Sequence, residues 1–367
     1  MAYMKEIILR ELSRQKAVPC VSVLISTEKK SFGEKINFEN EVTAIEKELK
    51  TKINPELAQK FTASINDLLI GADIRLLQHG IGIFINPVYS KLVYFSFPVK
   101  PKIVVNSNFE LREVIADQNK LAPYYALLVC KDVTRLFQGS GPELVEVLND
   151  DFPILHDKIM AQEHIESWRY FKASEPKTSL EKLDVYFKKI DSIAGKYIES
   201  FPLVLMGTDK YIRGFSANTR FKYLIVGEKT GSYNKHTIFT LSQLVWPVVQ
   251  NFQEKDLIKS LDNARKLLNM NKGVSGIQDT WDIAKIGIGK ELFVEEDFIC
   301  SGFIKNNGDG SNGQLVLTND NNSDYVEIKD AVEVVMETLL NTHGTKIHLV
   351  ENDTLKDAGR IILTTKY

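Results

Sequence analysis

Residues 330–367 read DAVEVVMETLLNTHGTKIHLVENDTLKDAGRIILTTKY, and this stretch decides the fold class of the chain. Asp330 is of the residue type that caps helices, and Gly344 is of the type that ends them in a left-handed backbone. The runs 347–350 and 360–365 predict two buried strands, so the stretch resembles the closing unit of an α/β domain. The apolar residues between the two helix signals recur at helical spacing: Val332, Val335, Met336, Leu339 and Leu340.

The composition is that of a folded globular protein. The chain has 367 residues, 44% hydrophobic and 26% charged, and is long enough for two or three domains with separate cores. Its formal net charge is -2, so contact with nucleic acid requires a local basic patch. We expect a mixed α/β and α+β protein of three domains, over residues 1–118, 119–249 and 250–367.

The cysteine and histidine patterns predict no metal site and no cofactor. Cys20, Cys130 and Cys300 lie far apart, which fits a reducing compartment and argues against structural zinc. Cys130 lies in an apolar run and is interpreted as a small buried residue. No apolar stretch reaches the length of a membrane span, and the first residues predict an amphipathic helix. We therefore expect a cytoplasmic protein without membrane contact, and the oligomeric state stays open.

Apolar periodicity predicts the elements of each segment. The helices are expected over 38–49, 55–69, 180–198, 257–268 and 279–286. A three-stranded antiparallel meander is expected over 124–131, 134–138 and 144–148. The other strands are expected over 19–27, 81–85, 92–97, 201–206, 221–226 and 291–294.

Three stretches in a fixed order carry a family resemblance. Residues 20–27 form an apolar strand that ends in Ser-Thr, and residues 97–115 read FPVKPKIVVNSNFELREVI. Residues 125–147 combine an apolar strand, a turn, Arg-Leu-Phe and a Glu-Val strand, and PLVLMG follows at 202–207. This order, with the closing stretch 330–367, resembles the third family of bacterial relatives of archaeo-eukaryotic release factors, and the resemblance covers nearly the full chain.

The resemblance implies a middle domain of RNase-H-like topology over 119–249, with a sheet and helices. It also implies a C-terminal α/β domain similar to kink-turn-binding ribosomal proteins over 250–367. The implied function is binding of the ribosome or of structured RNA, in translation termination or in the rescue of stalled ribosomes. No DNA partner is implied.

The catalytic Gly-Gly-Gln loop of release factors is missing from the matching region. Residues 151–178 contain no glycine and one glutamine, Gln162. The functional interpretation makes Gln162, with His156 or His164 nearby, a degenerate hydrolytic tip, whereas the favoured interpretation is an ordinary polar loop. Pelota, which the chain also resembles, lacks this tripeptide and acts by binding. We therefore expect a protein that is not an enzyme.

Residues 210–236 are the most basic window, with six basic side chains and one acidic residue, Glu228, for a charge of +5. Cations for phosphates and aromatic faces for bases suit RNA. An equally open interpretation has Phe221 and Tyr223 on the inner face of one strand and the charges outside. The candidate RNA-binding residues are Lys210, Arg213, Arg220, Lys222, Lys229, Lys235 and Tyr233.

Two other function classes remain open. One is a hydrolase that acts through the loop 156–164, and the other is a stress- or defence-linked interaction protein without an RNA partner. An RNase-H-like domain also raises the possibility of a carboxylate nuclease site. Asp132 is better explained as a turn residue and Asp184 as part of a solvated helix face, so the nuclease is disfavoured.

Overall fold

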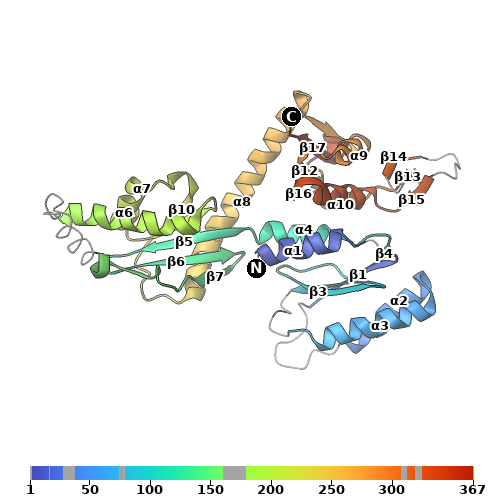
Figure 1. Cartoon of the computed structure of the whole chain (residues 1–367), viewed down its shortest axis with the longest axis horizontal. Coiled ribbons are helices and arrows are strands. Elements are labelled where there is room, and N and C mark those ends of the chain that lie inside the picture. The colour runs from blue at the N-terminus through green and yellow to red at the C-terminus, as the bar shows by residue number, and fades with distance from the viewer. Residues whose placement is uncertain are drawn as a thin grey trace. The chain divides into compact units, whose positions relative to one another are not determined.

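The computed structural model describes residues 2–15, 17–27, 38–73, 76, 79–159, 179–306, 312–318 and 325–366. The chain divides into two compact units. The terminal unit combines Tyr3–Lys120 with Lys259–Tyr367, and the middle unit is Leu121–Ile258. The elements of both are labelled in Figure 1.

The N-terminal part of the terminal unit is an antiparallel sheet in the order β3-β2-β1-β4. Alternate residues of β1 face opposite sides, as the two-residue period of a strand requires. Val21, Val23 and Ile25 pack under α2 and α3, whereas Leu24 belongs to the cluster that includes residues of α1 and α4. The elements are α1 (Ala2–Ser13), β1 (Cys20–Ser26), α2 (Glu39–Lys52), α3 (Pro55–Ile70), β2 (Gly80–Asn86), β3 (Tyr89–Phe95), β4 (Lys102–Asn106) and α4 (Arg112–Lys120).

The C-terminal part holds a four-stranded sheet in the order β11-β17-β12-β16 and a three-stranded sheet in the order β14-β13-β15. β12 pairs parallel with β16 and antiparallel with β17. The elements are β11 (Gly273–Ser275), α9 (Ile277–Ile286), β12 (Gly289–Glu295), β13 (Gly302–Asn306), β14 (Asn312–Val316), β15 (Tyr325–Ile328), α10 (Ala331–His343), β16 (Lys346–Val350), η3 (Lys356–Ala358) and β17 (Ile361–Thr365).

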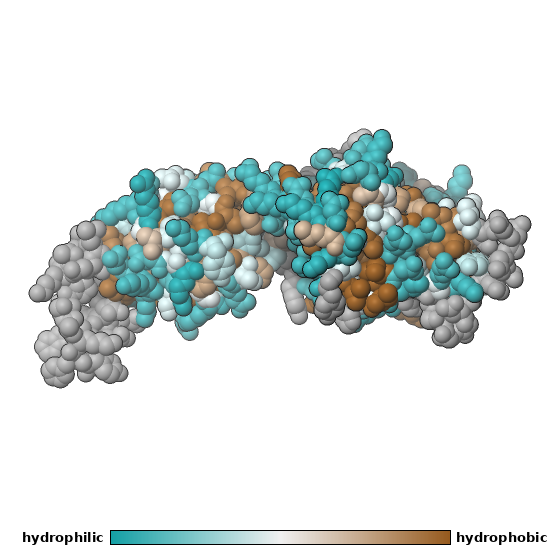
Figure 2. All heavy atoms as spheres, turned by 90° about the horizontal axis from the view of Figure 1, so that it is seen from above, coloured by the Kyte–Doolittle hydropathy of each residue, from teal (hydrophilic) through white to brown (hydrophobic). Residues whose placement is uncertain are grey.

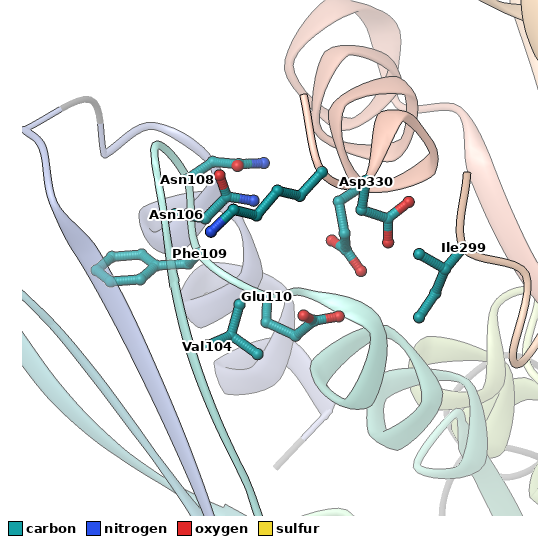
Figure 3. A pocket seen from close by; sticks show the side chains of 9 residues that line it. Val104, Asn106, Asn108, Phe109, Glu110, Ile299 and Asp330 are labelled. Atoms are coloured by element: carbon teal, nitrogen blue, oxygen red, sulfur yellow. The ribbon is translucent and has the colours of Figure 1, made fainter. Parts of the chain in front are cut away.

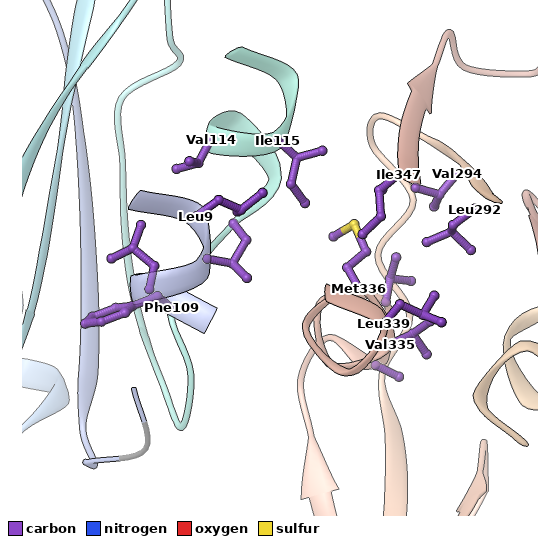
Figure 4. Packing of buried hydrophobic residues seen from close by; sticks show 14 of the residues in the cluster. Leu9, Phe109, Val114, Ile115, Leu292, Val294, Val335, Met336, Leu339 and Ile347 are labelled. Carbon is purple, nitrogen blue, oxygen red and sulfur yellow. The ribbon is translucent and has the colours of Figure 1, made fainter. Parts of the chain in front are cut away.

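Helix α10 has the boundaries that its sequence predicts. Asp330 Oδ1 accepts a hydrogen bond of 3.0 Å from the backbone N–H of Val332, and Gly344 has a φ of 67°. One apolar cluster contains residues of α10, β12, β16, α1 and α4 (Figure 4). In that view Met336 of α10 lies beside Ile347 of β16. The cluster ties the two ends of the chain together within the terminal unit.

The middle unit is built on a sheet in the order β10-β9-β5-β6-β7, with β8 paired to β6. The expected antiparallel meander is confirmed in β5, β6 and β7. Residues of α6 and α7 pack with one face of the sheet, and the first half of α8 packs with the other. The elements are β5 (Pro123–Val129), β6 (Val133–Ser140), β7 (Glu143–Glu146), β8 (Ile154–Leu155), α6 (Ser179–Ile198), β9 (Leu203–Gly207), α7 (Asp209–Asn218), η2 (Lys222–Leu224), β10 (Ile225–Thr230) and α8 (Ile238–Asn269).

The mixed α/β fold class is confirmed, one expected strand is wrong, and one expected helix is confirmed but begins earlier than predicted. The strand predicted over 221–226 is the short helix η2 followed by β10, because the chain makes a turn before it rejoins the sheet. The helix predicted over 257–268 is the end of α8, which begins at Ile238 and continues through Pro247. Since α8 runs across position 249, the division into 1–118, 119–249 and 250–367 stays a prediction.

No helix in the part of the chain that the structure describes is long and apolar enough to cross a membrane. The face of the molecule shown in Figure 2 is largely hydrophilic, with smaller areas of hydrophobic residues between the polar ones.

Candidate functional site

Three parallel strands of the middle unit end at the same edge of the sheet. The register pairs Val129 of β5 with Gly207 of β9, and Gly207 with Thr230 of β10. Gly231 N–H donates a hydrogen bond of 2.8 Å to Gly207 O, so the segments after β9 and β10 start side by side. Ligands of α/β sheets bind outside the carboxyl ends of parallel strands. We call this place, formed by residues 130–132, 208–213 and 229–236, the carboxyl edge.

The predicted basic residues fall into two groups, one at the carboxyl edge and one at the opposite edge of the sheet. Lys210 and Arg213 lie in the first turns of α7, directly after β9, and Lys229, Tyr233 and Lys235 lie at or after the end of β10. Arg220 and Lys222 precede β10 and therefore lie at the opposite edge of the sheet. The six residues of β10 span roughly 17–20 Å, so the seven candidates do not form one cluster.

Two of the predicted cations are paired with carboxylates. Arg213 Nε lies 2.9 Å from Asp209 Oδ1 one helical turn away, with its side chain 79% exposed. Arg220 Nε lies 2.8 Å from Oδ2 of the buried Asp191. Asp191 Oδ1 also accepts hydrogen bonds from Thr219 Oγ1 at 2.6 Å and from the Arg220 N–H at 3.1 Å. Arg220 and Asp191 therefore fasten the turn after α7 to α6.

The lysines of the window differ from its arginines in their ion pairing. Lys210, Lys222 and Lys235 are exposed, and Lys229 is half-buried. Within the described ranges, the structure shows no ion pair for any of these four side chains. Lys210, Lys229 and Lys235 belong to the carboxyl edge, which thus holds three of the four.

The aromatic residues of the window do not share one strand face. Tyr223 lies in η2 with 76% exposure, so the inward-facing interpretation is wrong for it. Tyr233 packs against the core beneath the sheet, and its hydroxyl donates a hydrogen bond of 2.9 Å to Thr230 O. Its ring meets that of His236 edge-on at 5.3 Å between centroids.

The base of the predicted loop adjoins the carboxyl edge. His156 N–H donates to Asp132 O at 3.1 Å, and the His156 ring meets the Tyr186 ring edge-on at 4.9 Å. His156 Nδ1 lies 3.5 Å from Oδ1 of the neighbouring Asp157. Gln162 and His164 lie outside the described residues.

The nucleophile-type side chains beside His156 are not activated. Tyr186 Oη lies 2.9 Å from Thr134 Oγ1 and 3.4 Å from Cys130 O. Burial raises the pKa of Tyr186 to about 12 and the pKa of the Cys130 thiol to about 11. Both groups are therefore protonated at neutral pH and are poor nucleophiles. The interpretation of Cys130 as a buried residue is confirmed, since it is 7% exposed.

A second polar site, which the sequence does not predict, lies in the terminal unit. A pocket of about 180 Å³ lies between the segment before α4 and the start of α10 (Figure 3). The carboxylates of Glu110 and Asp330 approach it from these two elements. Beside it, Arg112 Nη2 lies 2.9 Å from Asp330 Oδ2, and both side chains are nearly buried. The neighbouring sequence indicates that Asp330 caps a helix. It does not indicate the ion pair, because the partner Arg112 is 218 positions away.

Across the described parts of the chain, no group of three or more His, Cys, Asp or Glu side chains is arranged to hold a metal ion.

A segment that covers most of the middle unit and the start of the following part matches a known protein family. Residues 123–287 match the model of the bacterial archaeo-eukaryotic release factor family 3, which confirms the resemblance. None of the curated proteins matches the sequence.

Three solved structures are similar over nearly the whole chain, at low identity. The archaeal translation termination factor aRF1 has 12% identity and a TM-score of 0.27, covering 100% of this chain and 98% of that chain. Dom34 of S. cerevisiae has 12% identity and a TM-score of 0.41, covering 99% and 93%. Archaeal Pelota in a ribosome-bound model has 9% identity and a TM-score of 0.42, covering 99% and 94%.

Proposed function

We propose that this chain, whose residues 123–287 match the model of the bacterial archaeo-eukaryotic release factor family 3, is a translation-related factor that binds the ribosome or structured RNA. It would act in translation termination or in the rescue of stalled ribosomes, without hydrolysing the peptidyl ester itself. The observation that carries the proposal is the family match, which spans nearly the whole middle unit.

The carboxyl edge of the middle unit supplies the proposed contact surface. Lys210, Lys229 and Lys235 lie there without a carboxylate partner in the described structure, so their charge is available to phosphates. Arg213 and Arg220 are weaker candidates because Asp209 and Asp191 already neutralise them. Ligands of α/β sheets usually bind at the carboxyl ends of parallel strands, so the position of this edge also favours the binding of RNA phosphates there.

Co-sedimentation with ribosomes tests the proposal. The triple variant Lys210→Glu, Lys229→Glu and Lys235→Glu should bind about tenfold or more weakly, because three phosphate contacts become repulsive. The matched control changes Lys60, Lys188 and Lys255 to Glu, which alters the net charge equally at exposed positions away from the carboxyl edge. We expect the control to bind like the wild type.

Two results would overturn parts of the proposal. Equal binding by both triple variants would remove the carboxyl edge as the contact surface. A wild-type protein that binds neither ribosomes nor structured RNA would favour an interaction protein without an RNA partner.

A peptidyl-tRNA release assay separates binding from hydrolysis. The region 151–178 lacks glycine, and the neighbouring Tyr186 and Cys130 are held protonated. We expect the wild type to release peptide at the spontaneous rate, and Gln162→Ala and His164→Ala to leave that rate unchanged. Release by the wild type that either substitution abolishes would instead identify a hydrolase.

A further inference from the structure

The ionic cluster beside the pocket of the terminal unit contains more carboxyl groups than cations. Lys102 Nζ of β4 lies 2.9 Å from Glu113 Oε1 and 3.4 Å from Glu110 Oε1. Arg112 at the start of α4 is the second cation, and Asp330 and Glu333 of the α10 N-terminus complete the cluster. Four carboxyl groups thus face two cations, in a place where most of these side chains are nearly buried.

Glu333 is the most buried acid of the cluster, with 4% of its side chain exposed. Its Oε2 accepts a hydrogen bond of 3.1 Å from the backbone N–H of Leu111. Its Oε1 lies 3.2 Å from Arg112 Nε, but the N–H does not point at it, and this buried oxygen accepts no hydrogen bond. A fully charged Glu333 would leave that oxygen without a donor.

The carboxyl groups of Glu110 and Glu333 meet at one guanidinium nitrogen: Arg112 Nε lies 3.8 Å from Glu110 Oε1 and 3.2 Å from Glu333 Oε1. Both residues line the pocket, and their carboxyl groups lie within hydrogen-bonding reach of each other. Two carboxylates in contact in a desolvated site cannot both stay ionised, so one of them keeps a proton. A proton placed between Glu110 and Glu333 turns a repulsive pair into a hydrogen-bonded one. The shared proton also allows Oε1 of Glu333, which otherwise has no hydrogen-bond partner, to form a hydrogen bond.

We propose that Glu110 and Glu333 share one proton in the folded protein, and that this proton is a pH-dependent lock between the segment before α4 and helix α10. When the proton leaves, two adjacent carboxylates repel each other across this junction. The cations that face the pair are shared with the other acids, because Arg112 also pairs with Asp330 and Lys102 also pairs with Glu113.

Other charged groups around the pair do not replace this proton. Glu337, one turn further along α10, accepts a hydrogen bond of 3.1 Å from Asn108 Nδ2. Lys329, which directly precedes Asp330 in the chain, also lines the pocket, and its side chain is exposed. Loss of the proton on the Glu110–Glu333 pair therefore adds a negative charge to the junction.

The sign of the pH effect follows from burial. Burial, and then the charge of Glu110, raise the pKa of Glu333 well above its ordinary value. Folding therefore takes up a proton, and the stabilisation is complete at acid pH and is lost as the pH rises through the folded-state pKa. Between the pKa of Glu333 in the unfolded chain and its pKa in the folded protein, the folded state holds one proton more. The unfolding equilibrium constant therefore rises up to about tenfold for each pH unit in this interval.

Glu333→Gln tests the lock in the full-length chain. The amide keeps the shape of the side chain and can donate a hydrogen bond to Glu110, but it has no proton to lose. Denaturant unfolding from about pH 5 to about pH 9 should show the wild-type unfolding constant rising relative to that of the variant, by up to about tenfold per pH unit. Glu337→Gln, a buried acid on the same helix, should keep the wild-type profile.

Parallel pH profiles for the wild type and Glu333→Gln would overturn the proposal. Infrared spectroscopy gives a second measurement that does not require unfolding. At neutral pH the wild type and Glu337→Gln should show the carbonyl stretch of a protonated carboxylic acid, and Glu333→Gln should lose it. A wild-type spectrum without this band at neutral pH would also overturn the proposal.

Discussion

At the scale of single residues, His348 makes the stability of the terminal unit sensitive to acid. It lies in β16, stacked on Phe293 at 4.7 Å between ring centroids. Burial, and then the charge of Lys346, lower the pKa of His348 from 6.5 to about 4. Glu291 Oε2 lies 3.4 Å from Nε2 without forming a hydrogen bond, so burial prevails over this carboxylate.

The folded protein therefore keeps His348 neutral, while the unfolded chain binds a proton below its ordinary pKa. Stability is complete above about pH 6.5 and falls as the pH drops toward 4, by roughly 2 kcal/mol at pH 5. We expect His348→Gln to remove this loss, measured by denaturant unfolding at pH 7 and pH 5. An unchanged loss in the variant would assign the acid sensitivity to other groups.

Asp191 and Arg220 contribute unequally to the middle unit, although they form one ion pair. Asp191 is buried and accepts three hydrogen bonds, whereas the Arg220 side chain is 70% exposed. Asp191→Ala should lower the free energy of unfolding by about 2 kcal/mol, because three hydrogen-bond donors lose their acceptor. Arg220→Ala should cost less than about 1 kcal/mol, as exposed ion pairs do. Thermal unfolding of both variants measures the difference, and equal losses would contradict it.

At the scale of elements, two glycines set helix boundaries in the terminal unit through backbone conformation alone. Gly344 ends α10 with φ 67° and ψ 35°, and Gly276 precedes α9 with φ 78° and ψ 156°. A Cβ at either position would meet no atom within 4 Å. Any cost of substitution therefore comes from the backbone and not from packing.

Gly344→Ala should destabilise the protein by about 1–2 kcal/mol, the cost of a left-handed L-residue. Gly276→Ala should cost more, because glycine alone readily adopts its combination of φ and ψ. Unfolding of the two variants under identical conditions measures the order. Gly344→Asn serves as the control and should cost less than Gly344→Ala, since asparagine tolerates the left-handed region. The reverse order of the two alanine variants would contradict the backbone explanation.

At the scale of the whole molecule, charge is distributed locally around a near-neutral total. The formal net charge of the chain is -2, yet the carboxyl edge holds three lysines without carboxylate partners in the described structure. If these lysines bind phosphates, log K for RNA should fall linearly with log salt concentration. The triple lysine variant should reduce the slope by about 2–3, since each lost phosphate contact removes roughly 0.7–0.9. An unchanged slope in the salt titration would exclude these lysines from the contact.

The sequence of residues over short stretches determined most of the helices and strands and the fold class. Helix α10 begins at Asp330 and ends at Gly344 as predicted, because capping and apolar periodicity act over a few residues. The strand predicted over 221–226 was wrong because a short apolar run also fits the turn of η2 that precedes β10.

The tertiary structure alone decided which charges remain available. It paired Arg220 with Asp191 on another helix, and it divided the basic window between two edges of one sheet. It also brought Arg112 to Asp330 across 218 positions and buried Glu333 beside them. These pairings depend on how strands and helices pack, and no spacing along the chain encodes that packing.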